Sequence, residues 1–126
     1  MKYTLEVAVI PVTDVDRAKA FYSEQLGFSV DVDNRMGDGF RNVQTTPQGS
    51  GCSVTFGTGL TPGLQLCVSD IAAAHEELST RGVEVTNVQH IDENGWQDGP
   101  GGPWNSFFFF KDPDGNNWAV QEKPSE

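Results

Sequence analysis

The sequence predicts an α+β fold built from two consecutive modules, each with the order strand–helix–three strands (βαβββ). The main observation is an internal repeat: a strand-like apolar segment leads into the helix start Thr13-Asp14, and the same arrangement recurs at Ser69-Asp70. The second observation is a Pro- and Gly-containing turn before the last strand of each copy. A chain of 126 residues has the size of one domain, with a first module at about residues 1–58 and a second at about residues 61–123.

In the first module, the helix that begins at Thr13-Asp14 is expected to end at Gly27, because glycine adopts the left-handed conformation that closes many helices. Apolar residues recur on one face of this helix and predict a buried stripe, formed by Val15, Ala18, Tyr22 and Leu26. The strands of this module are expected at residues 5–12, 28–32, 39–45 and 52–57.

In the second module, the helix that follows Ser69-Asp70 is expected to end at Gly82. Its apolar stripe consists of Ile71, Ala74 and Leu78. Strands are expected on either side of this helix, at residues 64–68 and 83–88.

The clearest strand pair flanks the turn Asp112–Asn116, where Pro113 fixes φ and Gly115 accepts a positive φ. Four consecutive phenylalanines, Phe107–Phe110, precede this turn and are strand formers with much apolar surface to bury. After the turn, side chains alternate between two faces. Trp118 and Val120 lie on one face, and Asn117, Ala119 and Gln121 lie on the other, which is the expected floor of a binding cavity.

The second module is longer than the first because of residues 89–105, a segment rich in glycine and proline that contains Trp96 and Trp104. A long connection of this kind is usually functional or disordered. Two tryptophans favour a lid over a cleft, since their rings need a surface to cover. The alternative is that both rings simply hold the loop against the core.

Composition excludes several classes of function. The net charge of −10 disfavours binding to nucleic acids and anionic membranes, and it reflects either solubility or a preference for cationic ligands. No apolar run approaches the roughly 20 residues of a membrane span, and the first residues do not resemble a signal peptide. Cys52 and Cys67 fit no metal-binding spacing and are interpreted as reduced thiols of a cytoplasmic protein.

Two stretches carry a resemblance to a known family. The segment Val7–Val30, VAVIPVTDVDRAKAFYSEQLGFSV, and the turn Lys111–Asn116, KDPDGN, resemble the vicinal oxygen chelate superfamily. That superfamily includes glyoxalase I, extradiol dioxygenases, and fosfomycin and bleomycin resistance proteins. With Val68-Ser69-Asp70 and Arg81-Gly82-Val83, the resemblance covers nearly the whole chain. It implies paired βαβββ modules whose sheets curl around a cleft, and a homodimer in which the first strand, near Pro11, lies close to the interface.

The resemblance also implies four positions at which metal-dependent members carry histidine or glutamate. Counted from the motifs, these positions are occupied here by Val7, Ser53, Gly63 and Ala119. None of these side chains is a competent ligand for a divalent cation, because only Ser53 has an oxygen, and it is a weak ligand. We therefore expect no metal and no cofactor.

Strand alternation predicts which other residues share a face with these four positions. They are Leu5, Val9, Thr55, Gln65, Cys67, Asn117 and Gln121. The resulting cavity is apolar with scattered amide and hydroxyl groups, which suits a neutral or weakly polar organic molecule. The alternative is that these side chains fill the cleft themselves.

Groups suited to catalysis are scarce, so we name no catalytic residue. His75 is interpreted as a solvated residue of the second helix, and His90 opens the long loop, where it could reach the cleft. Cys67 has no basic neighbour that would lower its pKa.

Two classes of function follow. The first is a metal-free protein that sequesters a bulky aromatic natural product or antibiotic. In this interpretation, a planar ligand, either neutral or cationic, is sandwiched by Phe40, Trp96, Trp104 and Phe107. The alternative is a glyoxalase-like lyase, isomerase or dioxygenase with an unrecognised active site, since the fold alone does not settle function. The candidate ligand-binding residues are Phe40, Ser53, Thr55, Gln65, His90, Trp96, Trp104, Phe107, Asn117 and Gln121.

Overall fold

The computed structural model describes residues 2–124, and its elements follow the βαβββ order twice, with one additional strand in the second copy. The first copy contains β1 (Thr4–Val9), α1 (Val15–Ala20), the π-helix η1 (Phe21–Gln25), β2 (Ser29–Met36), β3 (Phe40–Thr46) and β4 (Ser53–Thr58). The second contains β5 (Gly63–Val68), α2 (Ile71–Thr80), β6 (Gln89–Asp92), β7 (Gly95–Asp98), β8 (Phe107–Lys111) and β9 (Asn117–Glu122).

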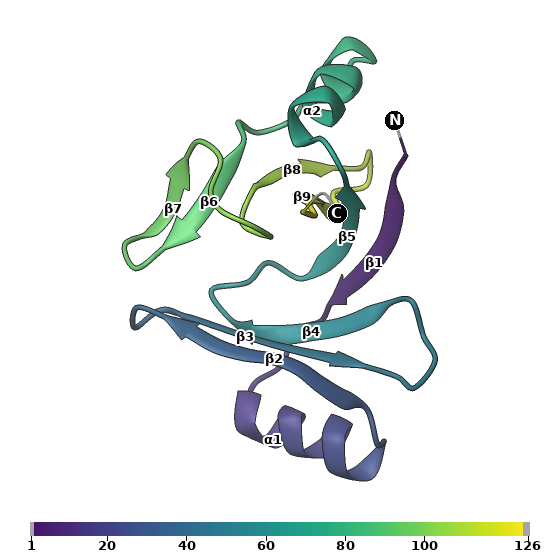
Figure 1. Ribbon diagram of the computed structural model, residues 1–126, viewed down its shortest axis with the longest axis vertical. Helices are drawn as coiled ribbons and strands as arrows, with labels where there is room; N and C mark the ends of the chain where they lie inside the picture. The colour runs from purple at the N-terminus through teal and green to yellow at the C-terminus, as the bar shows by residue number, and fades with distance from the viewer. Residues whose placement is uncertain (1, 125–126) are drawn as a thin grey trace.

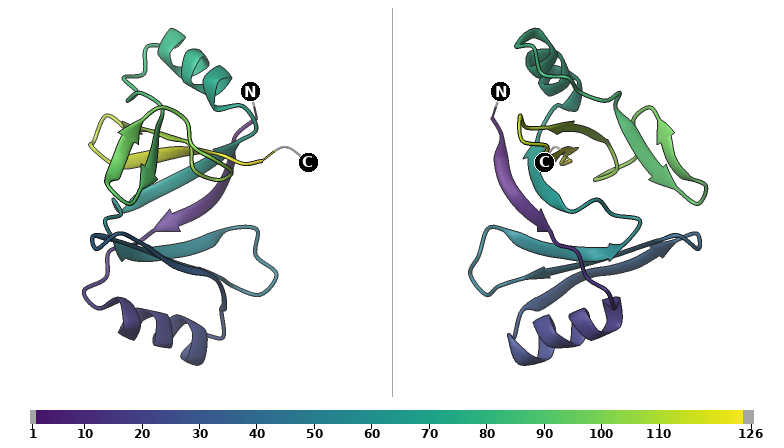
Figure 2. Two further views of the ribbon diagram at one scale, coloured as in Figure 1. Left: turned by 60° about the vertical axis from the view of Figure 1, so that its left-hand side comes forward. Right: turned by 180° about the vertical axis from the view of Figure 1, so that it is seen from behind.

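The nine strands form one mixed sheet in the order β2-β3-β4-β1-β5-β9-β8-β6-β7. The two copies meet at β1 and β5, which pair antiparallel, while β1 pairs parallel with β4 and β5 pairs parallel with β9. The sheet curls into a half-barrel, with α1 outside β2–β4 and α2 outside the strands of the second copy (Figures 1 and 2). This arrangement confirms the predicted α+β fold and leaves the inner face of the sheet free of helices.

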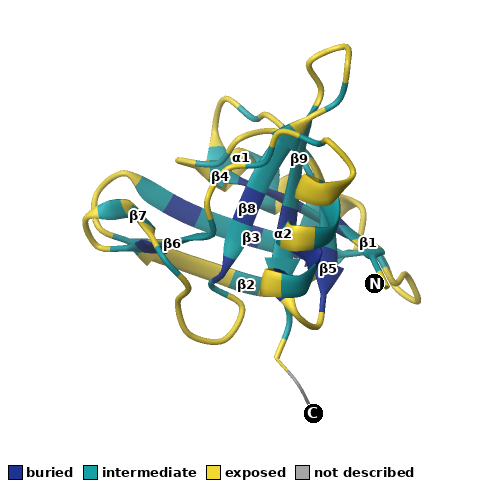
Figure 3. Cartoon of the chain, turned by 90° about the horizontal axis from the view of Figure 1, so that it is seen from above, coloured by how far each residue is buried: buried dark blue, intermediate teal, exposed yellow. Residues whose placement is uncertain are grey.

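The second copy contains the better-packed hydrophobic core. Ile71 and Ala74 of α2 are buried against Val68, Phe108 and Val120. Figure 3 shows α2, with exposed positions on its outer surface, beside strands β5 and β8, which contain buried positions. His75 belongs to this contact, because its ring stands edge-on to Phe108, with centroids 5.2 Å apart, and its Nε2 lies 2.9 Å from the Thr86 carbonyl oxygen. His75 is therefore half-buried, and it is not the fully solvated residue that the sequence suggested.

The first helix packs less completely than its sequence predicts. It changes to π-helical geometry after Ala20, and the Leu26 N–H donates to the carbonyl of Phe21. Tyr22 packs between Phe28 and Phe56, as expected for a core-facing residue. Leu26, however, is 48% exposed at the end of the π-helical segment.

The strand expected at residues 83–88 does not form. Thr86 lies beside Phe109 and exchanges hydrogen bonds with it, but one of these bonds uses the side-chain hydroxyl, since the Phe109 N–H donates to Thr86 Oγ1. At Thr86 a side-chain hydroxyl, and not a backbone carbonyl, accepts the hydrogen bond from β8. The regular backbone hydrogen bonds of the sheet therefore begin only at β6. The following segment is not a simple loop either, because β6 and β7 form a hairpin.

A β-bulge in β1 corrects one prediction of strand alternation. Val7 pairs with Gln65, but Leu5 pairs with Leu66, so the register shifts between them. The shift places Leu5 on the outer face with Leu66, where it is 50% exposed, instead of in the cavity. Among the described residues, no helix has the length and apolar character that crossing a bilayer requires.

Candidate ligand-binding cavity

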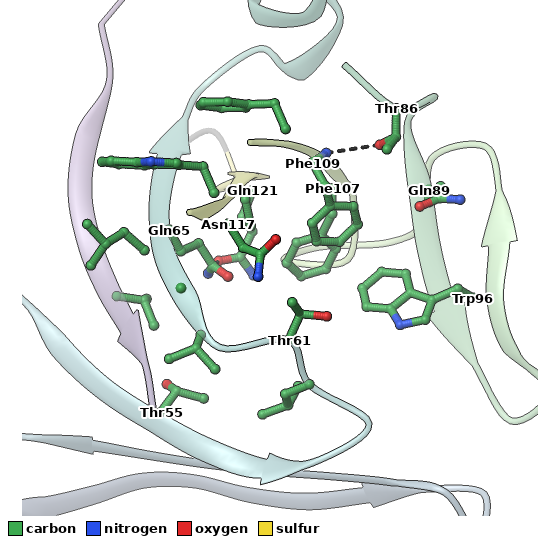
Figure 4. A pocket seen from close by; sticks show the side chains of 18 of the residues that line it. Thr55, Thr61, Gln65, Thr86, Gln89, Trp96, Phe107, Phe109, Asn117 and Gln121 are labelled. Atoms are coloured by element: carbon green, nitrogen blue, oxygen red, sulfur yellow. Dashed lines mark hydrogen bonds between the residues drawn. The ribbon is translucent and has the colours of Figure 1, made fainter. Parts of the chain in front are cut away.

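The curled sheet encloses a cavity of about 950 Å³. Its floor comes from β1, β5 and β9, one wall comes from β3 and β4, and the opposite wall comes from β6, β7 and β8 (Figure 4). The loop Gly59–Thr61 and residues 84–86 complete its border. The cavity is therefore built from both copies of the βαβββ repeat, and it exists only when the two are joined along β1 and β5.

Strand register explains which side chains point inward. Val7, Gln65, Ala119 and Phe109 lie in one row across β1, β5, β9 and β8, because each is paired with the next. Since neighbours in a row share a face, the inward direction of Ala119 fixes that of the others. Trp118, expected on the opposite face, also borders the cavity. It stacks on Phe110 with nearly parallel rings 6.0 Å apart, and Phe110 borders the cavity as well.

One wall of the cavity is aromatic. Phe107 and Phe109 project from the same face of β8 with nearly parallel rings 6.2 Å apart. Trp96 of β7 stands edge-on to both rings, at centroid distances of 5.4 and 5.3 Å. The β6–β7 hairpin thus brings Trp96 to the cavity, and the three rings offer an apolar surface to a flat ligand.

The amide side chains on the floor already have partners. Gln65 Nε2 donates to Gln121 Oε1 at 2.7 Å, and Gln121 Nε2 donates to the carbonyl oxygen of Trp104 at 2.7 Å. Asn117 Nδ2 makes a longer bond of 3.3 Å to the carbonyl of Pro62. These amides line the cavity, but their bonds within the protein reduce what they can offer to a ligand.

Seven of the ten residues expected to bind ligand line the cavity in the structure: Phe40, Thr55, Gln65, Trp96, Phe107, Asn117 and Gln121. Ser53, His90 and Trp104 lie outside its lining. Ser53 Oγ is bonded to Thr46 Oγ1 and accepts from Gln44. His90 Nδ1 lies 2.9 Å from the Gly99 carbonyl, so its ring is held by its own loop.

Trp104 differs from the prediction because of its backbone. It adopts a φ of 63°, which is uncommon for a residue with a side chain, and 51% of its surface is exposed. Its carbonyl oxygen, and not its ring, faces the cavity floor by accepting from Gln121. Of the two tryptophans in residues 89–105, only Trp96 lines the cavity.

Sequence reasoning missed Asn42, which lies on β3 between the cavity-lining residues Phe40 and Gln44. Alternation along β3, starting from Phe40, was the signal that could have found it. Asn42 Oδ1 and Thr55 Oγ1 are buried and have no hydrogen-bond partner among the described residues. These two oxygens of the cavity wall can therefore each still form a hydrogen bond.

The strand register gives a different count for one of the four positions at which the resemblance implies metal ligands. By the repeat, Val7 corresponds to Gly63 and Val9 corresponds to Gln65. Thr55 pairs with Val9 and Ala119 pairs with Gln65, so the counterpart of Ala119 is Thr55 and not Ser53. Counting from the turn failed because the two turns differ in length.

The corrected set, Val7, Thr55, Gly63 and Ala119, does not suit a divalent cation. It contains no imidazole and no carboxylate, and a hydroxyl is a weak ligand. At Gly63 a Cβ would lie 2.3 Å from the carbonyl oxygen of Asn117, so the backbone leaves no room for a ligating side chain. Within the described residues, no group of three or more His, Cys, Asp or Glu side chains is placed to hold a metal ion.

Few titratable groups border the cavity. Among the described lining residues, the ionisable side chains are Glu84 and Lys111, both exposed. Cys67 is buried near the floor, where burial and, to a lesser extent, the charge of Glu6 raise the pKa of its thiol to about 11. Its thiol therefore stays protonated and is a poor nucleophile at neutral pH.

Comparisons with known proteins found similarities in sequence and in structure. Residues 8–45 match the model of the family described as bleomycin resistance protein-like N-terminal. A glyoxalase/bleomycin resistance protein from Streptomyces sp. CB03234 is 31% identical, with 94% of this chain and 99% of that chain covered and a TM-score of 0.39. TnmS3, an antibiotic-binding protein from the same organism, is 30% identical, with 95% of each chain covered and a TM-score of 0.40.

A third similarity concerns the fold alone. Methylmalonyl-CoA epimerase from Mycobacterium tuberculosis superposes with a TM-score of 0.73 at 20% identity, with 97% of this chain and 88% of that chain covered. The two Streptomyces proteins are similar to this chain in sequence over nearly its full length. The epimerase is similar in the arrangement of its strands and helices.

Proposed function

Because the chain belongs to the vicinal oxygen chelate superfamily, which includes the glyoxalase and bleomycin resistance proteins, we propose that its cavity binds a small molecule. We propose specifically a metal-free protein that sequesters a planar aromatic natural product or antibiotic. The observation that carries this proposal is the wall formed by Trp96, Phe107 and Phe109, which faces a cavity of about 950 Å³.

The size and lining of the cavity support a ligand of several fused rings. Pockets for drug-sized molecules have volumes of about 300–1,000 Å³ and mainly apolar linings with a few placed polar groups. A flat ring system that rests against Phe107 and Phe109 would remove apolar surface from water on both sides and add aromatic contacts worth about 0.5–1.5 kcal/mol. The identity of 30% with an antibiotic-binding protein supports the same class of ligand.

The charges at the cavity favour a neutral ligand over a cationic one. Glu84 and Lys111 border the cavity with opposite signs, so the lining has no excess of negative charge despite the net charge of −10. The other acidic residues of the described chain lie outside the cavity lining and act on it through a screened field. An enzyme of the same fold would have to use these two exposed groups as its acid and base, since neither histidine lines the cavity.

A set of three planar probes tests the proposal: hydroxymethylanthracene, methoxymethylanthracene and aminomethylanthracene. They share one ring system, and only the amine is cationic at neutral pH. We expect the two neutral probes to bind, measured by titration calorimetry. Trp96→Ala should weaken binding of both by about 1–3 kcal/mol, as expected for an aromatic hot spot.

Trp104→Ala is the matched control, because it removes a tryptophan of the same segment that does not line the cavity. We expect the affinity of this variant to stay within about twofold of the parent, which is less than 0.5 kcal/mol. If neither neutral probe binds to the parent protein, or if Trp96→Ala and Trp104→Ala have the same effect, the proposed aromatic site is wrong.

A further inference from the structure

Two buried polar atoms on the β3–β4 wall lack hydrogen-bond partners within the described protein: Asn42 Oδ1 and Thr55 Oγ1. Thr55 is only 6% exposed, and both residues line the cavity. Buried polar groups are nearly always hydrogen-bonded, because leaving one without a partner costs about 1–3 kcal/mol. Two such atoms in one wall therefore require an explanation.

The neighbouring polar side chains of this wall, in contrast, form hydrogen bonds within the protein. Gln44, which is paired with Thr55 across the strands, donates through Nε2 to Ser53 Oγ. Thr45, on the opposite face of β3, donates to the carbonyl of Val54. Among the described residues, the buried side-chain atoms without a hydrogen-bond partner are thus Asn42 Oδ1 and Thr55 Oγ1, on the same wall as Gln44.

The two residues lie close enough to serve one group of a ligand. Asn42 and Gln44 are alternate residues of β3 and share its inner face, and Thr55 lies opposite Gln44. Asn42 and Thr55 are therefore diagonal neighbours across an antiparallel pair, about 7–8 Å apart at their backbones and nearer at the ends of their side chains. A single polar atom between them can contact both.

We propose that Asn42 Oδ1 and Thr55 Oγ1 form a subsite for a hydrogen-bond donor, a hydroxyl or N–H group, at the edge of the aromatic ligand. This inference rests on the proposed function and assigns its polar selectivity to β3 and β4. The ligand donates to Asn42 Oδ1, and Thr55 Oγ1 accepts from the same group or donates to it. The amides of Gln65 and Gln121, bonded to each other, contribute less to selection.

The subsite and the aromatic wall impose one orientation on the ligand. Thr55 and Trp96 lie on opposite sides of the cavity in Figure 4. The ring system then faces Trp96, Phe107 and Phe109 on the wall from the second copy, while the donor edge points to the wall from the first. A molecule with rings but no donor is held on one side only.

The matched pair hydroxymethylanthracene and methoxymethylanthracene tests this subsite, because methylation removes the donor and leaves the ring system unchanged. We expect the parent protein to bind the alcohol about five- to tenfold more tightly than the ether, which is the effect of one net hydrogen bond. Thr55→Val and Asn42→Leu should each bring this ratio close to one by weakening the alcohol and leaving the ether unchanged.

Thr61→Val is the control, since Thr61 also lines the cavity but is exposed to solvent, and its variant should keep the parental ratio. A second measurement separates binding from structure. Without ligand, Thr55→Val and Asn42→Leu should melt at the same or a higher temperature than the parent, because each removes a buried group that lacks a partner. If one variant fails to fold, the other still gives the ratio.

The outcomes distinguish this inference from the proposed function. A parental ratio near one, or a ratio that both variants leave unchanged, overturns the donor subsite, while a loss of affinity in Trp96→Ala would still support the aromatic site. If neither neutral probe binds, both proposals fail together. If the alcohol is preferred but Thr61→Val abolishes the preference, the subsite lies on the Gly59–Thr61 loop and the assignment to Asn42 and Thr55 is wrong.

Discussion

The side-chain amide of Gln65 donates a hydrogen bond of 2.7 Å to the amide oxygen of Gln121, and so joins β5 to β9 across the floor of the cavity. The same oxygen lies 3.8 Å from the Cys67 sulfur, and the Gln121 amide nitrogen extends the chain of bonds to the Trp104 carbonyl. The two glutamines therefore act as part of the scaffold that fixes the cavity floor.

This relationship predicts coupling between the two residues. Gln65→Leu and Gln121→Leu should each lower the free energy of unfolding by about 1 kcal/mol, with a larger loss for Gln121, which also releases the Trp104 carbonyl. The loss in free energy of unfolding of the double variant should be smaller than the sum of the losses of the two single variants, by about 0.5–1.5 kcal/mol. Urea denaturation measures all four proteins, and strictly additive losses would show that the contact contributes nothing.

A second prediction concerns metal. The side chains of Val7, Thr55 and Ala119 are poor ligands, and Gly63 has no room for a Cβ beside Asn117. We therefore expect neither EDTA nor added Zn²⁺ to change the melting temperature, since a structural metal contributes directly to folding. A chelator-induced fall of several degrees would contradict both this expectation and the proposed metal-free function.

A third prediction concerns acid. Arg41 is buried, and its guanidinium donates to Asp33 at 3.0 Å through both Nε and Nη2 and to Asp16 through Nη1 at 2.8 Å. Hydrogen bonding to Arg41, with a further bond from Lys19, holds the pKa of Asp33 well below its usual range, and Arg41 also lowers the pKa of Asp16.

The sign of the effect follows from these depressed values. A carboxyl whose pKa is lower in the folded state stabilises the fold above its unfolded pKa of about 3.9, and this stabilisation is lost as the pH falls through the folded pKa. The free energy of unfolding should therefore decrease below about pH 4. Asp33→Asn should make the free energy of unfolding fall less steeply with decreasing pH. The control Asp38→Asn, on an exposed turn, should leave the pH dependence of the parent unchanged. If the free energy of unfolding, measured by urea denaturation, has the same pH dependence in all three proteins, the Asp33–Arg41 contact does not contribute.

A fourth prediction concerns assembly. We expect a two-fold homodimer, as the resemblance to the superfamily implies. Phe21 and Leu26 are 44% and 48% exposed on the outer side of the first copy, and a second chain would cover such apolar surface. Light scattering should give twice the chain mass at tens of micromolar protein, and a Phe21→Asp, Leu26→Asp variant should shift it towards the monomer. A monomeric parent would contradict the expectation.

Much of the fold was accessible from the sequence because its signals are local. The Asp14 and Asp70 side chains cap their helices as predicted, each accepting from the backbone N–H three residues later. Alternation along β9 correctly places Ala119 and Gln121 in the cavity lining, with Val120 fully buried on the other face. These features depend on neighbours within a few residues, which the sequence states directly.

The errors have the opposite origin. The outward position of Leu5 depends on a bulge opposite Gln65 and Leu66, which come from the other copy of the repeat. The absence of a strand at residues 83–88 depends on the hydroxyl of Thr86 reaching the Phe109 N–H. Neither event leaves a pattern in its own segment, because each is a contact between residues distant in the chain.

The sequence by itself determined the repeated βαβββ order, the capped helices and the inward face of the last strand, since period-two alternation and capping residues act locally. Only the tertiary structure decided which tryptophan lines the cavity. Trp96 reaches it because the β6–β7 hairpin packs its ring against Phe107 and Phe109, while the positive φ of Trp104 leaves that ring exposed. Likewise, the lack of hydrogen-bond partners for Asn42 Oδ1 and Thr55 Oγ1 becomes visible only when the burial and the hydrogen bonds of the neighbouring side chains are known.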